Sequence, residues 1–132
     1  MLKLIQDVSS FHAATGTPIL SRTAFPADER VDLRVSLVDE EVNRELLPAI
    51  AARDMVKTAD GIVDSIYVLV GMALEFGVPL AAVHFVVQRA NMAKVDPATG
   101  FVRKREDGKI LKPEGWQEPD VEGTLLRFGY RP

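Results

Sequence analysis

Two pairs of acidic residues are the part of this sequence best suited to act together in chemistry. Glu41 and Glu45 are four residues apart, and so are Asp60 and Asp64 further along the chain. Residues four apart are neighbours on one face of an α-helix, so the carboxylates of each pair can converge. Glu40 shares the broad helical face of Glu41. The apolar run after Asp64 predicts a partly buried face, where repulsion and burial both make ionisation costly.

A hard divalent cation would resolve that conflict. Mg²⁺ and Mn²⁺ prefer octahedral oxygen coordination and are often held by a few carboxylates together with substrate phosphates. Two antiparallel helices, each with an acidic pair, could hold such ions in the crevice between them. Alternatively, the acids are solvated and paired with Arg44, Arg53 or Lys57. The chain has no cysteine, so a metal bound here must be a hard one held by oxygen.

A second cluster, further along the chain, is basic. Asn91 and Lys94 are three residues apart at the end of a predicted helix, where a lysine suits phosphate or the helix dipole. Five more basic residues follow within a short span: Arg103, Lys104, Arg105, Lys109 and Lys112. One interpretation is an anionic ligand that bridges the metal and these cations. The other is a solvated, charged tail.

The signatures of several other catalytic sites are absent. The sequence has no GxxxxGK phosphate loop, no GxGxxG, no HExxH and no GxSxG. His12 and His84 are far apart in the sequence, and we expect each to be structural. Trp116 could stack on a base, but we expect it to pack, for instance at a subunit contact.

Helices must position the acidic and basic residues, because periodicity and capping signals predict an all-α fold. Pro48 is a flaw in the second predicted helix, since an interior proline kinks or breaks a helix. Gly77 is a good residue to end the third helix, and Pro79 can open the fourth. The expected architecture is a bundle of four to five helices with an irregular basic C-terminal segment. The predicted helices cover about residues 2–14, 28–53, 58–76, 80–94 and 120–128, with a loop at 15–29 and a hairpin or bent loop at 101–112.

Composition narrows the function classes. The chain has 132 residues, with 16 Lys and Arg against 19 Asp and Glu, and a net charge of −3 argues against stable nucleic-acid binding. This near-balance hides two blocks, because residues 28–64 carry a net −5 and residues 89–112 a net +4. The sequence therefore predicts that the acidic block binds metal and the basic block binds phosphate.

Length and apolar patterning predict one domain over residues 1–132. A chain this small buries a modest core, so self-association would help to complete it. No apolar stretch approaches the ~20 residues of a membrane helix, and no targeting segment is visible. We therefore expect a cytoplasmic protein that does not associate with membranes.

Four ordered pieces of this sequence resemble the MazG-like all-α nucleoside triphosphate pyrophosphohydrolases. The likeness is to single-domain bacterial and phage members, including the dUTPase-like branch and phage MazZ-type enzymes. It extends over about residues 33–126, and the order and spacing of the pieces are more specific than any one of them. The pieces are Leu37–Glu41, Asp60–Val68, Arg89–Lys94, and Asp107–Lys109 with Lys112–Trp116.

The resemblance implies a helical bundle that works as a dimer or a dimer of dimers. It implies Mg²⁺- or Mn²⁺-dependent cleavage of a (deoxy)nucleoside triphosphate to monophosphate and pyrophosphate, and some phage members of this kind consume dGTP or dATP. The family's ligand motif is EExxE on one helix and ExxD on the next. Glu40 and Glu41 match the first two positions, and Asp64 matches the last.

Two positions depart from that motif. Arg44 and Gly61 stand where the family has glutamates, and the substitute acids are Glu45, one residue later, and Asp60, one residue earlier. Each substitute is rotated by about 100° around an α-helix. Both acids could reach the metals if the helices are slightly rotated, and Arg44 could instead contact phosphate. Alternatively, the chain holds fewer ions or is a catalytically degenerate module that binds nucleotide or protein.

The resemblance also implies roles for individual residues. Metals would neutralise the triphosphate and position a water that Glu41, or Glu40 in its place, orients or deprotonates. Lys94 would hold the departing pyrophosphate with the basic tail, in which we include Arg103 and Lys112. Asn91 would help to place the sugar or phosphates. A phosphoribosyl-ATP pyrophosphohydrolase, which has a related fold, is a further alternative that the loop at 15–29 and the Lys112–Trp116 tail disfavour.

Overall fold

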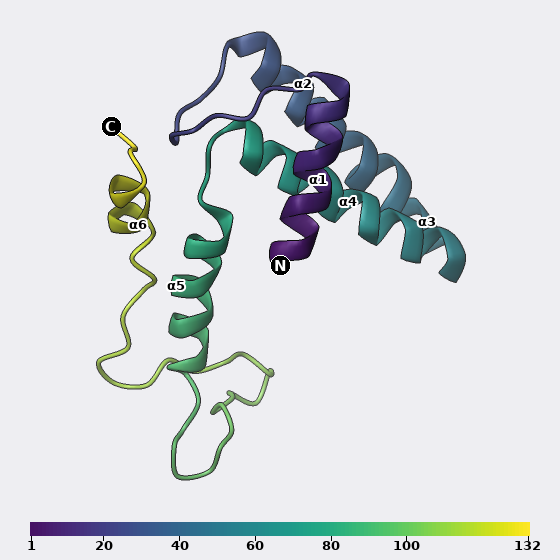
Figure 1. Ribbon diagram of the computed structural model, residues 1–132. Helices are drawn as coiled ribbons and strands as arrows, with labels where there is room; N and C mark the ends of the chain where they lie inside the picture. Colours follow the sequence, from purple (N-terminus) through teal and green to yellow (C-terminus); the bar gives the residue numbers. More distant parts are fainter.

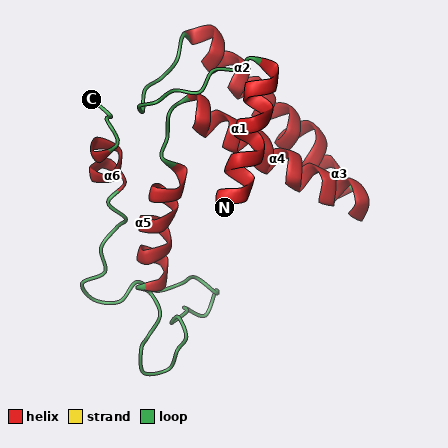
Figure 2. Ribbon diagram, in the orientation of Figure 1, coloured by secondary structure: helices red, strands yellow, loops and turns green.

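Every regular element of the chain is helical, and the computed structural model describes all of residues 1–132 (Figures 1 and 2). The elements are α1 Leu2–Thr15, α2 Asp28–Val38, η1 Asp39–Leu46, α3 Leu47–Ala51, α4 Met55–Glu75, α5 Leu80–Met92 and α6 Val121–Arg127. Because α2, η1 and α3 follow one another without a break, the chain has five helices. The all-α prediction is confirmed.

The second helix continues through Pro48 because its middle part, η1, is a π-helix. At the end of η1 the Leu47 N–H donates to the carbonyl of Val42, five residues back. Pro48 comes next and has no N–H to donate, so the change of register coincides with a residue that could not make the α-helical bond. Pro48 then lies in the first turn of α3, where a missing N–H is tolerated. The predicted flaw is thus a change of helix type rather than a break.

Capping residues set the ends of α4. The Asp54 side chain accepts a hydrogen bond from the Lys57 N–H at 3.0 Å, so α4 begins at Met55, three residues before its predicted start. At the other end Gly77 has φ 62°, as predicted for the residue after a helix. The chain direction then turns by 115° between α4 and α5. No single helix is long and apolar enough to span a membrane, and α4 with α5 meets that test only as this bent pair.

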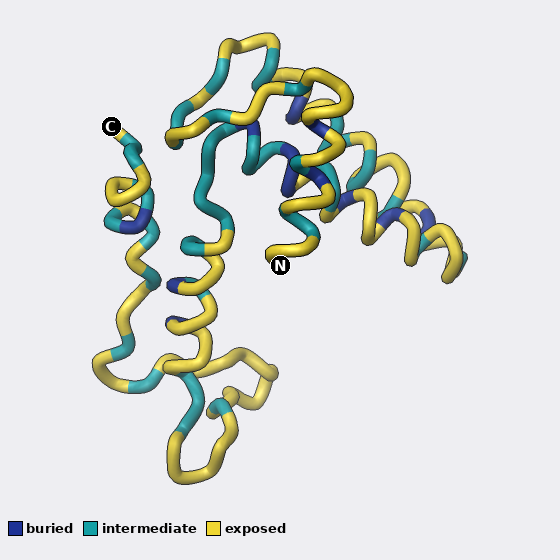
Figure 3. Tube along the Cα trace, viewed as in Figure 1, coloured by how far each residue is buried: buried dark blue, intermediate teal, exposed yellow.

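The helices form two groups (Figure 1). In one group α4 packs on η1, α1, α3 and α2, and in the other α5 packs on α6. Few side chains are buried, and the buried apolar residues are Val8, Ala49, Val70, Val86 and Ala90 (Figure 3). The expected single bundle is therefore open within one chain, because α5 leaves the other helices at the 115° turn.

A loop over residues 16–27 covers the C-terminal end of α4. Backbone N–H groups of Leu20 and Ala24 donate to the carbonyls of Leu74 and Phe76, at 3.1 and 3.0 Å. These bonds satisfy carbonyls that a helix end leaves free. The loop lies so close to Gly77 that a Cβ there would stand 2.2 Å from a backbone oxygen. Glycine is therefore required at this corner for space as well as for its positive φ.

A buried ionic cluster joins α1, α2 and α4. Glu75 is fully buried and accepts hydrogen bonds from Arg30 and Arg34. Nη2 of Arg34 also lies 3.1 Å from Nε2 of His12, which is buried. Burial tends to raise the pKa of Glu75, but the two arginines outweigh it and hold that pKa below its usual range. The expected structural role of His12 agrees with this placement.

Candidate active site

Five carboxylates line one hollow between η1 and α4. Its volume is about 320 Å³, and no apolar side chain contributes to its wall. η1 and α4 pack against each other, which brings together acids that are up to 24 residues apart in sequence. The lining residues are Glu40, Glu41, Glu45, Lys57, Asp60, Gly61 and Asp64. All five acids that the sequence suggested as metal ligands thus lie in one place.

The five acids repel one another, and none of them forms an ion pair with a basic side chain. None of them takes part in an ion pair, so the alternative in which they pair with neighbouring arginines or lysines does not describe this structure. Burial raises the pKa of Glu41, and the negative charges of Asp64, Glu40, Glu45 and Asp60 raise it further. The hollow therefore favours a positive charge near Glu41.

The donor set fits a hard cation in chemical type. All the acidic side chains offer oxygen, the ligand that Mg²⁺ and Mn²⁺ prefer. No three of them surround a common point closely enough to hold an ion as they stand, so binding would require side-chain rotation.

Only Glu41 is half-buried, and the other four acids are exposed. The expectation that Asp60 and Asp64 lie on a partly buried face is wrong for the single chain. Ile62 and Val63, which lie between them in the sequence, are exposed as well.

Arg44 lies outside the hollow. Its guanidinium pairs with Asp39 at 2.7 Å, and 71% of its side chain is exposed. Asn43 donates to the same Asp39 carboxylate at 2.8 Å. The structure thus separates Arg44 from the acids, although the sequence placed it on their face.

The predicted basic cluster lies elsewhere, at the end of α5. Lys94 donates to the Asn91 side chain at 2.9 Å and lines a hollow of about 290 Å³ with Arg103. Lys112 stands 4.2 Å from the centre of the Trp116 ring. The Trp116 indole N–H donates to the carbonyl of Ala90 at 2.7 Å, so this side chain packs on α5, as expected.

One chain does not bring the acidic and basic clusters together. From Asp64 to the end of α4 the helix runs about 17 Å, and from the start of α5 to Asn91 it runs about 17 Å more. Between them lies the 115° turn, so the acids in the first half of α4 and the basic cluster at the far end of α5 lie on two diverging helices (Figure 1). Within a single chain, the acids and the basic residues therefore cannot act on the same substrate as predicted.

A second hollow lies one helical turn from the acidic one and was not predicted. Its volume is about 300 Å³. Leu37 precedes Glu41 by one turn, and Val68 follows Asp64 by one turn, so the two hollows share the crevice between the second helix and α4. Its other walls come from α1 and the following loop, whose positions no local sequence pattern reveals. The lining residues are Phe11, His12, Thr15, Thr17, Arg30, Leu33, Arg34, Leu37, Tyr67 and Val68.

Comparison with known proteins gives this geometry its context. Residues 8–91 match the sequence profile of the family described as phosphoribosyl-ATP pyrophosphohydrolase. The chain belongs to this family. Its fold is similar to the crystal structure of a candidate NTP pyrophosphohydrolase from Exiguobacterium sp. 255-15, with 28% identity, a TM-score of 0.52 and 94% of each chain covered. No curated protein matches the sequence.

Family and fold together define the class of enzyme. The chain is a pyrophosphohydrolase with a MazG-like fold. The matched residues include all five acids of the hollow but end at Asn91, before Lys94 and the basic tail. The acidic hollow is therefore the candidate active site.

Proposed function

We propose that this chain hydrolyses a nucleoside or deoxynucleoside triphosphate to the monophosphate and pyrophosphate, using Mg²⁺ or Mn²⁺ held at the acidic hollow. The observation that carries the proposal is the set of five unpaired carboxylates around one hollow in a chain of this family. When bound, the cation would neutralise phosphate charge and lower the pKa of water. We place the protein in bacterial or phage nucleotide metabolism, with dGTP or dATP among the substrates to test.

In this proposal Glu41 orients and deprotonates the attacking water. It is half-buried, and its raised pKa makes its carboxylate a better proton acceptor than an ordinary exposed glutamate. Glu40 is the alternative base on the same turn. Lys57 is the cation that lines the hollow and can contact phosphate oxygens.

The second hollow is suited to the nucleoside part of the substrate. It lies one turn along the same crevice, and Phe11 and Tyr67 meet there edge to face with ring centres 5.9 Å apart. The Thr15 and Thr17 hydroxyls and the Arg30 guanidinium supply polar groups at its wall. A triphosphate at the acids would extend its sugar and base in this direction.

We also propose that the active form contains a second copy of the chain. The accessible surface is 9365 Å², whereas a compact monomer of 14.5 kDa exposes about 6,900 Å². The excess is close to what each partner buries in a large obligate dimer. Ile62, Val63, Ile66 and Leu69 form an exposed apolar stripe on α4.

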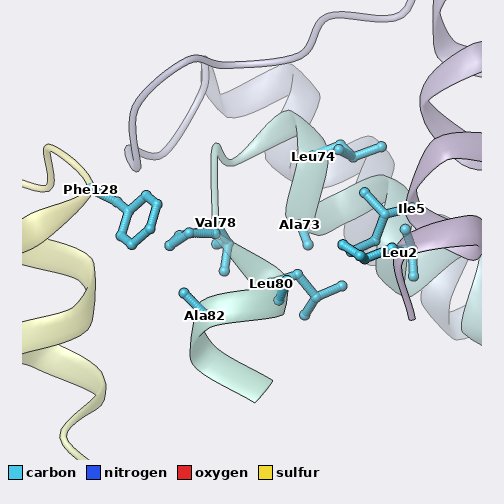
Figure 4. A pocket seen from close by; sticks show the side chains of 11 residues that line it. Leu2, Ile5, Ala73, Leu74, Val78, Leu80, Ala82 and Phe128 are labelled. Atoms are coloured by element: carbon cyan, nitrogen blue, oxygen red, sulfur yellow. The ribbon is translucent and has the colours of Figure 1, made fainter. Parts of the chain in front are cut away.

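A further apolar hollow extends this unpartnered surface. It has a volume of about 370 Å³ and lies between the start of α1, the α4–α5 corner and Phe128 (Figure 4). Leu2 and Ile5 of α1 face it from one side and Phe128 from the other. Side chains from the second copy would fill it.

A second copy would also allow the basic cluster to act. Asn91, Lys94, Arg103 and Lys112 can contact substrate at the acids only if they come from another chain. Mixing inactive Glu41→Gln chains with inactive Lys94→Ala chains should then restore part of the activity, because some sites would receive an intact residue from each. No recovery from a mixture of co-refolded chains would refute sharing of the site between chains.

The direct test is an assay of the products. The protein is incubated with Mg²⁺ or Mn²⁺ and each dNTP, each NTP and phosphoribosyl-ATP, and monophosphate and pyrophosphate are measured. Monophosphate with pyrophosphate is expected from at least one nucleoside triphosphate. Turnover of phosphoribosyl-ATP alone would reassign the substrate, and diphosphate with inorganic phosphate would refute the reaction type.

The alternative function is a nucleotide-binding module without turnover. The departures at Arg44 and Gly61 favour it, since neither residue supplies the carboxylate of the family motif. Saturable nucleotide binding by calorimetry with no product formed would support this alternative over the enzyme.

A further inference from the structure

The π-helical turns of η1 change which residues lie side by side. A π-helix closes its hydrogen bonds over five residues, so each turn holds more residues than an α-helical turn, and residues five apart come closer to the same face than they do in an α-helix. The Asp39 carboxylate accepts from Asn43, four residues on, and also from Arg44, five residues on, which is consistent with this wider turn. Glu40 and Glu45 are also five residues apart, each one residue after Asp39 and Arg44, and both line the acidic hollow. The extra residue in the turn therefore moves Arg44 out of the hollow and brings Glu45 in.

Gly61 is the residue on α4 that admits this wider turn. A Cβ at Gly61 would lie 3.1 Å from Cα and 3.2 Å from Cβ of Leu46, the last residue of η1. Gly61 is buried and lies inside α4, so its size matters here rather than a positive φ. An alanine here would require Leu46 to shift by a few tenths of an ångström, and the glutamate of the family motif would require more room still. Asp60, one residue earlier, supplies the α4 carboxylate instead.

We propose that the π-helical turn and Gly61 act as one coupled unit that positions Glu45 as a ligand of the divalent cation. The two departures from the motif then compensate each other. Extra length in η1 restores the third glutamate of that helix, and the loss of a side chain at Gly61 makes room for it. This inference rests on the proposed metal-dependent function and identifies the residues that position its site.

The test is a double-mutant cycle that combines two changes, deletion of Arg44 and the substitution Gly61→Ala. Deleting Arg44 places Glu45 four residues after Glu40, the spacing of an α-helical turn. Gly61→Ala alone should lower Mn²⁺ affinity by about tenfold or more, measured by calorimetry, and should lower the melting temperature. Deleting Arg44 alone should leave Mn²⁺ affinity nearly unchanged. The deletion combined with Gly61→Ala should recover both quantities, because the narrower turn leaves room for the added methyl group.

Arg44→Ala is the matched control, because it removes the same side chain and keeps the chain length. It should neither weaken Mn²⁺ binding nor rescue Gly61→Ala. Glu45→Gln should lower Mn²⁺ affinity in the wild-type background. Equal rescue by Arg44→Ala and by the deletion, no rescue by either, or an unchanged affinity in Glu45→Gln would overturn the inference.

These experiments distinguish a failure of the positioning inference from a failure of the proposed enzymatic function. Mn²⁺ binding and rescue without turnover of any nucleotide would refute the function and leave the positioning role standing. Turnover of a nucleotide with no rescue of Gly61→Ala would support the function and refute the positioning role. If the wild-type chain binds no Mn²⁺, Glu45 is not a ligand and the inference fails, whatever the melting temperatures show.

Discussion

Glu41 differs from the four acids around it because it alone is half-buried and its pKa is raised by all of them. Those two properties suit a proton acceptor better than a solvated metal ligand. The five acids lie together, as the sequence suggested from residues four apart meeting on a helix, and their role as metal ligands stays a prediction. The sequence misplaced Arg44, because a periodicity of 3.6 residues does not apply inside η1.

Glu41→Gln should abolish most of the catalysis. We expect kcat to fall by about 10²–10⁴-fold, the usual contribution of a positioned base. The melting temperature should hold or rise, because one of the mutually repelling charges is removed. Asp39→Asn is the control, since Asp39 pairs with Arg44 outside the hollow and should leave kcat nearly unchanged. A fully active Glu41→Gln enzyme would exclude Glu41 as the base.

At the scale of elements, the sequence identified the helices better than their arrangement. Aspartate, glycine and proline signals placed the ends of α4, α5 and α6 within a few residues, because capping is local chemistry. The packing of η1 on α4 brings together segments that are distant in the sequence, which a local pattern does not show. The hollow near Tyr67 escaped prediction for the same reason, since α1 and the loop after it form much of its wall.

The Asp54 cap should contribute measurably to stability. Asp54→Ala removes the acceptor for the Lys57 N–H, and we expect a loss of about 1 kcal/mol in the free energy of unfolding. Asp54→Ser keeps an acceptor and should lose much less. Urea denaturation followed by circular dichroism compares the two variants, and equal losses in both would contradict the capping role.

The cluster that joins α1, α2 and α4 should make stability depend on pH. Burial lowers the pKa of His12, and the positive charge of Arg34 lowers it further, against the opposing effect of Glu75 and the Pro18 carbonyl. His12 titrates near 6.5 in the unfolded chain, so below that pH the unfolded state binds a proton that the folded state resists. Stability is therefore fully present above pH 6.5 and is lost as the pH falls through the lower folded value.

His12→Gln tests this dependence, because glutamine can still accept from Arg34 but carries no titrating proton. Urea midpoints measured from pH 7.5 to 5.5 should fall for the wild-type chain and stay nearly level for the variant. Glu75 contributes little over this range, because its pKa is held below its usual value. The same slope in both proteins would show that another group is responsible.

At the scale of the whole molecule, the chain exposes more surface than a compact monomer of its mass, and many of its large apolar side chains are exposed. The sequence indicated that self-association would help a chain this small, but it could not say which face is uncovered. The structure identifies the α4 stripe and the hollow of Figure 4 as the uncovered surface.

Ile66→Glu should disrupt self-association. Ile66 lies in the exposed stripe of α4, and a buried unpaired charge at an interface costs several kcal/mol. Sedimentation analysis should show a smaller species than the wild-type chain forms, with reduced activity. Gln6→Glu, at an exposed polar position on α1, is the control and should sediment like the wild-type protein. A wild-type chain that sediments as a monomer would contradict the second copy altogether.

The close approach of Gly61 to Leu46 also constrains how this chain can have evolved. An inserted residue in η1 is tolerable only beside a glycine, and a glutamate at position 61 is tolerable only beside the shorter turn. The glycine could arise first without loss, but the extra residue could not, so we expect the extra residue only in chains that carry the glycine. Descendants with the extra residue should carry glycine opposite it, and a lineage that regains the glutamate should first have lost the insertion.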